Sequence, residues 1–403
     1  MTGTSANIGG SFGAAPVGED LLDRWATDTS GPVALYLKQE LAPVEQNDEH
    51  RVIFPPTYAD IGYNIDTLAD GTQVALVDSV GSQANRMEPL FKSPSDAERE
   101  SWLVPQIEIV LREEPCGACP ACKTEKKGKK GASRCESPLK IRQSILDLAH
   151  RSADAVVHAS PTLAPRMAAA FEALSRDGDA GPLCALAPTS LVFGVWDSRG
   201  GSGEKRPRLV RSIIRAWDVE PLTVSAQFNS IWKDLSESQQ QELRAESNKK
   251  GKSKLSDVGL ADAPAPAALG GVLVRGRIER DITVNLVALR GLRGADEEET
   301  RSLRRYLLGL SLVAATAEID LYLREGCHLR YTGEEVWLAV PRRGEPEDVD
   351  LCSEAARNTI REYANTAANH FRQKWPEEVE HAFDVTEAKR LLAAKGDHGG
   401  AGE

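Results

Sequence analysis

The sequence predicts a mixed fold, either α+β or α/β with antiparallel hairpins. Of the 403 residues, 41% are hydrophobic and 27% are charged, which is ordinary usage for a folded globular protein and argues against a disordered or coiled-coil chain. Segments with strand-like alternation interleave with segments of helical spacing, and long loops interrupt both. The chain shows no internal repeat.

The first elements alternate between short helices and strands. A helix is predicted over 19–26, where apolar residues share one face, and a strand over 33–41, where apolar and polar residues alternate. A β-branched strand over 73–80 leads through a glycine turn into a helix that ends at Glu88. A half-buried strand over 104–111 then runs into a cysteine cluster.

The rest of the chain continues this alternation. The predicted helices cover 144–158, 163–175, 297–318 and 349–375, and the predicted strands cover 190–196, 208–217, 272–289, 322–332 and 335–340. The organisation is one folded body over 19–395, with flexible tails at 1–18 and 396–403 and with insertions at about 112–142, 197–207 and 246–271. The first insertion is rich in Cys and Lys, the second is basic, and the third is a mobile Lys/Pro/Ala loop.

Charge and hydropathy limit where the protein acts. The net charge is −11, so a polyanion must be bound by a local patch and not by overall attraction. The first 18 residues lack the Lys or Arg and the apolar run of a signal peptide. No apolar stretch approaches the ~20 residues that span a bilayer. We expect a cytoplasmic protein with no membrane partner.

Four of the seven cysteines, Cys116, Cys119, Cys122 and Cys135, fall close together. In a long intracellular chain such a cluster indicates metal binding before disulfides. Four thiolates can enclose zinc tetrahedrally, and chelation would anchor a Lys-rich loop that apolar packing cannot hold. The spacing therefore predicts a structural zinc site. An iron–sulfur cluster and a set of reduced surface thiols are the alternatives.

Positive charge is segregated into runs within this acidic chain. Between Lys123 and Arg142, eight Lys or Arg stand against two Glu, and a further run spans Lys249 to Lys254. A third run contains Arg199, Lys205, Arg206, Arg208, Arg211 and Arg215 against Glu204 alone, with glycines that let a ligand approach the backbone. A single run is usually a solvated surface. Three runs together favour a groove that tracks a phosphate backbone.

The strand-to-helix turn around Gly81 offers donors for a phosphate or a sugar. Backbone N–H groups are free at a helix start, and Ser82, Gln83, Asn85 and Arg86 follow the glycine. The alternative is an ordinary capped helix with Ser82 as its N-cap.

No catalytic motif stands out. The sequence contains no phosphate-binding loop, no His-Glu-x-x-His and no Gly-x-Ser-x-Gly, and its seven histidines are scattered singly. Aromatic residues make up only 5%, too few for a broad base-stacking surface, so nucleic-acid binding would depend on backbone contacts.

Several segments, taken in order, resemble a known family. They are VALYLKQEL at 33–41, FPPTY at 54–58, LVDSVGSQANRMEPLF at 76–91, APTSLVFGVWDS at 187–198 and RPRLVRS at 206–212. They resemble the RAMP-superfamily backbone subunit, the "Cas seven" group, of type I-U (also called I-G) CRISPR interference complexes. The resemblance runs from about residue 21 to residue 340.

The resemblance implies an RRM-like (ferredoxin-like) antiparallel sheet with a thumb hairpin and finger loops. It implies a non-catalytic subunit that forms a filament of identical copies along the CRISPR guide RNA and presents the guide to target DNA. The large subunit and a small, Cas-five-like or Cas-six-like subunit would be further partners. By this match Ser82, Gln83, Asn85 and Arg86 become the first candidates for RNA contact. The next are Arg199, Lys205, Arg206, Arg208 and Arg211, on the basic hairpin that we expect to act as the thumb.

Two other functions stay open at this point. The first is a metal-dependent RNA-cleaving RAMP subunit, for which Asp66, Asp78 and Asp197 are the candidate carboxylates. The second is a zinc-loop scaffold for protein interactions that binds no nucleic acid.

Overall fold

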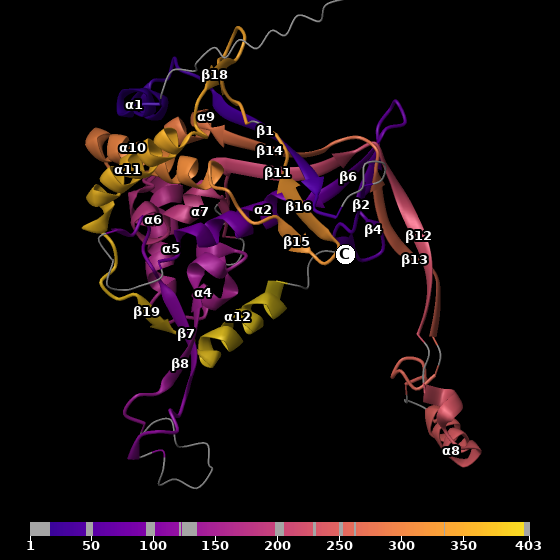
Figure 1. Cartoon of the computed structure of the whole chain (residues 1–403). Helices are drawn as coiled ribbons and strands as arrows, with labels where there is room; N and C mark the ends of the chain where they lie inside the picture. The colour runs from indigo at the N-terminus through magenta and orange to yellow at the C-terminus, as the bar shows by residue number, and fades with distance from the viewer. Residues whose placement is uncertain are drawn as a thin grey trace, which may run out of the picture.

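The structure is a computed structural model with mixed α+β architecture built on a large antiparallel sheet, as the sequence predicts (Figure 1). It describes residues 17–45, 51–93, 101–120, 122, 135–197, 205–228, 231–249, 253–261, 263–333 and 335–398. Residues 1–16 of the predicted tail 1–18 lie outside the described residues, while Val17 packs into the core.

The central sheet has nine strands in the described residues, and neighbouring strands within it pair antiparallel. Its main path runs β15–β16–β1–β14–β11–β6–β5, and β17 pairs with β1 and β18. The strands are β1 (Ala34–Pro43), β5 (Ile65–Thr67), β6 (Gln73–Asp78), β11 (Val210–Trp217), β14 (Ile278–Asn285), β15 (Tyr322–Arg324), β16 (Cys327–Tyr331), β17 (Trp337–Val340) and β18 (Glu347–Val349).

Strand β1 shows how the sheet divides into an inner and an outer face. Leu35, Leu37 and Leu41 are buried, whereas the intervening Lys38 and Glu40 are exposed, as the period of two in a strand requires. Helices pack on the sheet as α10 (Glu297–Ala315), which contacts β11 and β14, α2 (Val80–Met87), which contacts β11, and α9 (Leu286–Gly291), which contacts β1. One apolar core therefore joins the sheet and the helices.

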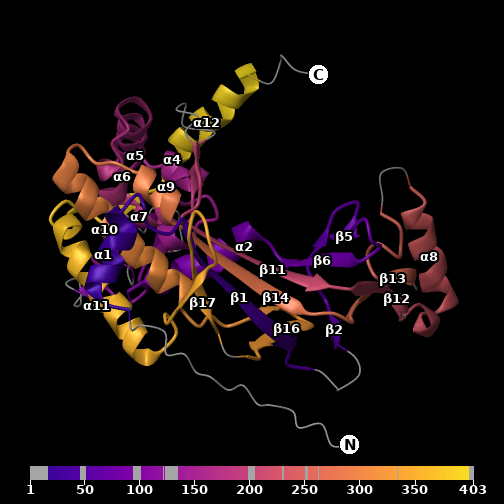
Figure 2. The ribbon, with the colours of Figure 1, turned by 90° about the horizontal axis from the view of Figure 1, so that it is seen from above.

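Most of the helices gather at one end of the sheet, as Figures 1 and 2 both show, whereas α8 (Glu237–Ser247) lies at the opposite end. They include α1 (Glu19–Thr27), α5 (Ala164–Glu172), α6 (Gly181–Leu186), α7 (Pro188–Val192) and α11 (Glu354–Arg372). Helices α10 and α11 approach closely at Gly309, where an added Cβ would lie 2.7 Å from the Cα of Ala364. Only glycine fits at this crossing.

Two hairpins project from the body (Figure 1). In one, β7 (Glu108–Glu114) pairs with β8 (Leu139–Ser144), and β19 (Glu380–Ala382) runs parallel to β7. In the other, β12 (Val219–Phe228) pairs with β13 (Ala263–Val274), β2 (Arg51–Ile53) adds at its base, and α8 (Glu237–Ser247) lies at its tip. Figure 2 places this second hairpin at the end of the molecule opposite α10 and α11.

The remaining elements are short, except for α12 near the C-terminus. They are β3 (Thr57–Tyr58), β4 (Gly62–Tyr63), β9 (Val195–Trp196), β10 (Lys205–Arg206), α4 (Ala155–His158) and α12 (Val385–His398), with 3-10 turns at Glu88–Phe91, Ile145–Asp147, Arg151–Ala153 and Ile231–Asp234 and a π-helical turn at Ala173–Asp177. None of the helices in the described ranges combines the length and apolar character that crossing a membrane requires.

The structure corrects several predicted elements. The predicted helix over 144–158 is instead the end of β8, two 3-10 turns and α4, with Arg151 at φ 53° interrupting helical backbone. The predicted strand over 190–196 is instead the last three residues of α7, which begins at Pro188, and, two residues later, the two-residue strand β9. Residues 263–271 of the predicted mobile loop belong to β13, and α12 extends three residues into the predicted tail 396–403.

Candidate nucleic-acid interface and metal site

Helix α2 follows β6, and its N-cap lies three residues before the position predicted from the sequence. Ser79 is the N-cap, and its side chain accepts a 3.2 Å hydrogen bond from the backbone N–H of Ser82. Ser82 is therefore inside the first turn and does not cap the helix. The helix buries Gln83, Ala84 and Met87 and leaves Asn85 exposed, and its other residues are half-buried.

Gln83 is the predicted contact that the structure places furthest from solvent, because its side chain is completely buried. Its amide nitrogen donates to Asp78 at 2.6 Å, and its amide oxygen accepts from Ser212 at 2.8 Å and from Arg280 at 2.9 Å. The amide oxygen thus accepts two hydrogen bonds and the amide nitrogen donates one, all inside the protein. A contact between Gln83 and a strand on the surface does not fit this position.

Arg86 and Ser82 line a small cavity of about 150 Å³, together with Tyr58 and Arg324. The Nε of Arg86 donates to Asp78 at 3.1 Å, and its Nη2 donates to the carbonyl oxygen of Leu323 at 3.0 Å. Arg86 is thus held in place and remains 29% exposed. A cavity of this volume has room for a single phosphate group.

Asn85 is exposed and connects α2 to a second, larger site. Its Oδ1 accepts a 3.1 Å hydrogen bond from Nη2 of Arg151. Arg151 is buried, forms a 2.7 Å ion pair with Glu88, and donates to the carbonyl oxygen of Gly194 at 3.4 Å. This arginine is therefore fixed from three sides.

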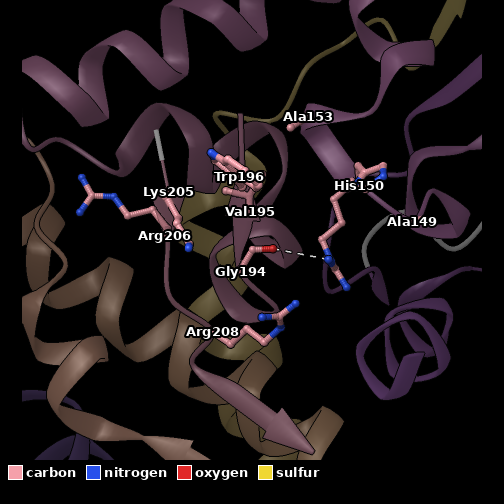
Figure 3. Close-up of a pocket in the computed structure, with 10 residues that line it drawn as sticks. Ala149, His150, Ala153, Gly194, Val195, Trp196, Lys205, Arg206 and Arg208 are labelled. Atoms are coloured by element: carbon pink, nitrogen blue, oxygen red, sulfur yellow. Dashed lines mark hydrogen bonds between the residues drawn. The ribbon is translucent and has the colours of Figure 1, made fainter. Parts of the chain in front are cut away.

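The second site is a basic cavity of about 370 Å³ (Figure 3). In the figure, Arg208 reaches toward the cavity, while Arg206 extends away from Trp196. The lining residues are Ala149, His150, Arg151, Ala153, Gly194, Val195, Trp196, Lys205, Arg206 and Arg208. Four of them are Lys or Arg and none is Asp or Glu, so the cavity suits an anion.

Mutual repulsion among these cations is visible at Arg208. Its pKa is lowered first by partial burial and then by the positive charges of Arg151 and Arg211. Arg208 forms no ion pair with an acidic residue in the described part of the chain. A bound phosphate would relieve this repulsion, which favours anion binding here.

The other predicted basic residues fall in three different places. Arg206 donates to the carbonyl oxygen of Leu174 at 3.3 Å and also lines a neighbouring cavity of about 300 Å³ with Arg176 and Arg293. Arg211 is exposed on β11, on the face opposite to Ser212. Arg199 lies outside the described residues, as do the Lys and Arg of 123–134 and Lys250 and Lys252.

Three carboxylates were candidates for metal-dependent cleavage. Asp78 is buried and accepts from Gln83 and Arg86. Asp197 is buried with its Oδ1 3.3 Å from Nε2 of His158, and Asp66 is exposed on β5. Among the described residues, the group able to hold a metal ion is a set of cysteines and includes none of the three.

The four predicted cysteine ligands gather between the ends of β7 and β8, and their sulfur atoms all lie within 4.8 Å of one another. The Sγ of Cys119 lies 3.3 Å from that of Cys122 and 3.8 Å from that of Cys135, and Cys116 lies 3.9 Å from Cys122. A tetrahedral site with zinc–sulfur bonds of about 2.3 Å has sulfurs about 3.8 Å apart. The predicted clustering is confirmed, and the donor set fits zinc.

Backbone N–H groups support this cluster as they would support thiolates. The N–H of Cys116 donates to the Sγ of Cys135, and the N–H of Cys119 donates to the Sγ of Cys116, both at 3.4 Å. Hydrogen bonds from the backbone N–H groups of Glu136 and Cys122 lower the pKa of Cys119 to about 6. Thiolate formation, which metal binding requires, is therefore favoured at Cys119 before any ion binds, whereas the hydrogen bond with Cys119 raises the pKa of Cys122 to about 12.

We expect protein purified without chelator to contain about one zinc per chain. Cys135→Ser should reduce this to below half, because Cys135 supplies the ligand from the β8 side. Elemental analysis measures the metal, and Cys352→Ser, which alters a cysteine outside the cluster, is the matched control. Equal zinc in both variants would contradict the assignment.

Sequence reasoning missed Arg151 and Trp196. Arg151 lies in a segment predicted as helix, and only its approach to α2, 66 residues away, makes it part of the site. Trp196 was taken as the end of a strand, although an aromatic residue beside a basic run was visible in the sequence.

Comparison with known proteins agrees with the CRISPR resemblance. Residues 35–221 match the family described as CRISPR-associated protein GSU0053, and no curated protein matches the chain. The matched segment contains β1, α2, the cysteine cluster and the basic cavity. The match does not name a subunit role. Residues 35–221, slightly less than half of the chain, are thus similar to the CRISPR-associated GSU0053 family.

Proposed function

We propose that the chain is the guide-RNA-binding backbone subunit of a type I CRISPR interference complex, and that it is not catalytic. The observation that carries this proposal is the basic cavity. Arg151, Lys205 and Arg208 converge there beside Asn85 of α2, although the chain as a whole has a net charge of −11. Such a patch gives an acidic protein a place for a phosphate backbone.

An RRM-like core is part of the proposal, and the topology supports it. The order β16–β1–β14–β11 has antiparallel neighbours throughout. The connection from β1 to β11 passes through helices, as does the connection from β14 to β16 through α10, while β11 and β14 are joined through the β12–β13 hairpin. This is the strand order of a split βαβ unit used twice.

The side chains of the site favour contacts with the sugar-phosphate backbone of a nucleic-acid strand. Arginine, lysine and amide side chains bind phosphates and sugars without regard to base identity. A subunit that must accept any guide sequence needs contacts of this kind, because pairing with target DNA reads the bases.

For assembly into a filament, the proposal takes the long β12–β13 hairpin as the thumb, in place of the basic hairpin to which the sequence analysis assigned it. It extends away from the body, and apolar side chains lie exposed on it, with Val224 49%, Ile231 60% and Leu269 45% accessible. Exposed apolar side chains on a protruding hairpin favour contact with a neighbouring copy or with another subunit of the complex.

The double variant Lys205→Ser with Arg208→Ser is expected to weaken binding of single-stranded RNA equally for unrelated sequences. Loss of two phosphate contacts should lower the slope of log affinity against log salt by about 1.4, at about 0.7 for each contact on a single strand. Titrations at several salt concentrations measure the slope.

The control removes the same charge elsewhere, at the exposed Arg361 of α11 and Lys389 of α12, and should leave the slope unchanged. An effect restricted to particular sequences, or the same loss in the control, would contradict backbone binding at the cavity. Cleavage of guide-matched RNA by the purified protein with magnesium or manganese would contradict the non-catalytic role.

A further inference from the structure

One tryptophan differs from the other six in its surroundings. Trp196 is 61% exposed, whereas Trp25, Trp102, Trp337 and Trp375 are buried and Trp217 and Trp232 are half-buried. Exposing an indole to water forgoes a large amount of apolar burial. An exposed tryptophan at the rim of a cavity is therefore a candidate for contact with a ligand.

The β9–β10 ladder fixes what Trp196 faces. It pairs Trp196 with Lys205 directly across the ladder, so both side chains project on the same side. The Nζ of Lys205 lies 5.6 Å from the centroid of the indole ring. The aromatic surface and a positive charge are thus presented together (Figure 3).

Glycine keeps the cavity open next to this pair. Gly194 has φ +79°, and an added Cβ would lie 2.8 Å from Cγ of Arg208. Any other residue would displace Arg208 and strain the backbone. Arg151 also donates to the Gly194 carbonyl oxygen, which helps to hold this part of the cavity wall in place.

The size and chemistry of the cavity match one nucleotide. Its volume of about 370 Å³ lies within the range of small-molecule sites. An aromatic plane accepts any base by stacking, since every base has a π face. The guanidinium of Arg208 and the ammonium of Lys205 supply the charge that a neighbouring phosphate requires.

We propose that one nucleotide of the bound strand docks in this cavity, with its base stacked on Trp196 and its phosphate at Lys205 and Arg208. The inference rests on the proposed RNA-binding function and adds a base contact to a site otherwise made of backbone contacts. The stacking does not distinguish between bases, so the subunit still accepts any sequence.

The test compares a uridine oligonucleotide with one of equal length whose sugars carry no bases. The wild-type protein should prefer the uridine strand, and Trp196→Ala should remove roughly 5- to 150-fold of that preference while binding the abasic strand as before. Trp196→Phe should restore most of it. Lys205→Ser with Arg208→Ser should weaken both strands equally.

Fluorescence provides the second readout. The uridine strand should quench the tryptophan emission of wild type and of Trp232→Phe, which alters a half-buried tryptophan on the β12–β13 arm, but should quench Trp196→Phe much less. An unchanged uridine preference in Trp196→Ala would overturn the docking and leave the proposed function intact. Failure of the wild type to bind either strand would overturn both.

Discussion

Gln83→Leu is expected to lower the free energy of unfolding by about 3 kcal/mol or more, while the protein that remains folded binds RNA nearly as the wild type does. The reason is a polar network in the core, at whose centre lies the fully buried Arg280. Arg280 donates to Gln83 at 2.9 Å, to Ser212 at 3.0 Å and to Gln39 at 3.1 Å. Breaking one member of a buried charged network typically costs 3–5 kcal/mol.

The two glutamines connect the buried cation to carboxylates that it does not contact directly. Gln83 turns its NH₂ to Asp78, and Gln39 turns its NH₂ to Glu335, while both oxygens accept from Arg280. Leucine at position 83 has a similar volume but leaves Arg280, Ser212 and Asp78 each short of a partner. Unsatisfied buried groups of this kind carry the full cost of desolvation.

Urea unfolding measures the change, and Ser82→Ala is the matched control because Ser82 is the preceding residue and lies outside this network. The control should stay within about 0.5 kcal/mol of wild type, as surface substitutions usually do. A Gln83→Leu protein of normal stability that had lost RNA affinity would show instead that Gln83 is a direct contact.

The segment Asp78–Glu88 shows how far a motif can be interpreted without a structure. The strand, the glycine turn and the helix were all predictable from local pattern, and so was the abundance of polar donors. Helical spacing also contained a usable signal, because Gln83 and Met87 are four residues apart and must share a face. What local pattern could not supply is that this face meets Arg280, nearly 200 residues away.

Elements that local pattern determines were predicted well, and elements that depend on long-range contacts were not. Helix α10 has an Asp296 cap and a long apolar face, and the predicted 297–318 matches Glu297–Ala315 closely. Residues 263–271 have little apolar character, and they form a strand because β12 pairs with them along its length. Strand formation that depends on pairing with a neighbouring strand is a tertiary effect, and local β propensity does not predict it.

In the metal site and the basic cavity, too, local spacing was predictable from the sequence and contacts between distant segments were not. Three of the four cysteines are neighbours in sequence, so their spacing was sufficient to predict the cluster. Lys205 and Arg208 were visible as a charge run. Arg151 could not be chosen from the sequence, because its role depends on contacts with Glu88, Asn85 and Gly194 from three separate segments.

The second large effect is expected from pH and involves Glu88. Burial raises the pKa of Glu88 to about 7, and the attraction of Arg151 only partly offsets this. A carboxyl whose pKa is higher in the folded state stabilises the fold fully below about pH 4.5, and this stabilisation is lost as pH rises through 7. The loss is about 3 kcal/mol for a shift of this size.

Comparison with Glu88→Gln isolates that contribution, since every other titrating group is common to both proteins. The unfolding free energy of wild type minus that of Glu88→Gln should fall by about 3 kcal/mol between pH 4.5 and pH 7. A difference that rose over this range would mean that the ion pair with Arg151 outweighs burial and lowers the pKa. Besides Arg151, Asp147 and Thr189 act on this carboxyl, Asp147 opposing its ionisation and Thr189 favouring it.

Protonation of Glu88 should also change the affinity for RNA. Protonated Glu88 carries no charge to compensate Arg151, which lies 2.7 Å away and reaches the cavity through its bond to Gly194. The cavity is then more positive below pH 7 than above it, so RNA affinity of the wild type should increase as pH falls from 8 to 6. In Glu88→Gln the Arg151 charge is uncompensated at every pH, so this component of the pH dependence should vanish. Parallel pH profiles in the two proteins would show that the buried pair acts on stability alone.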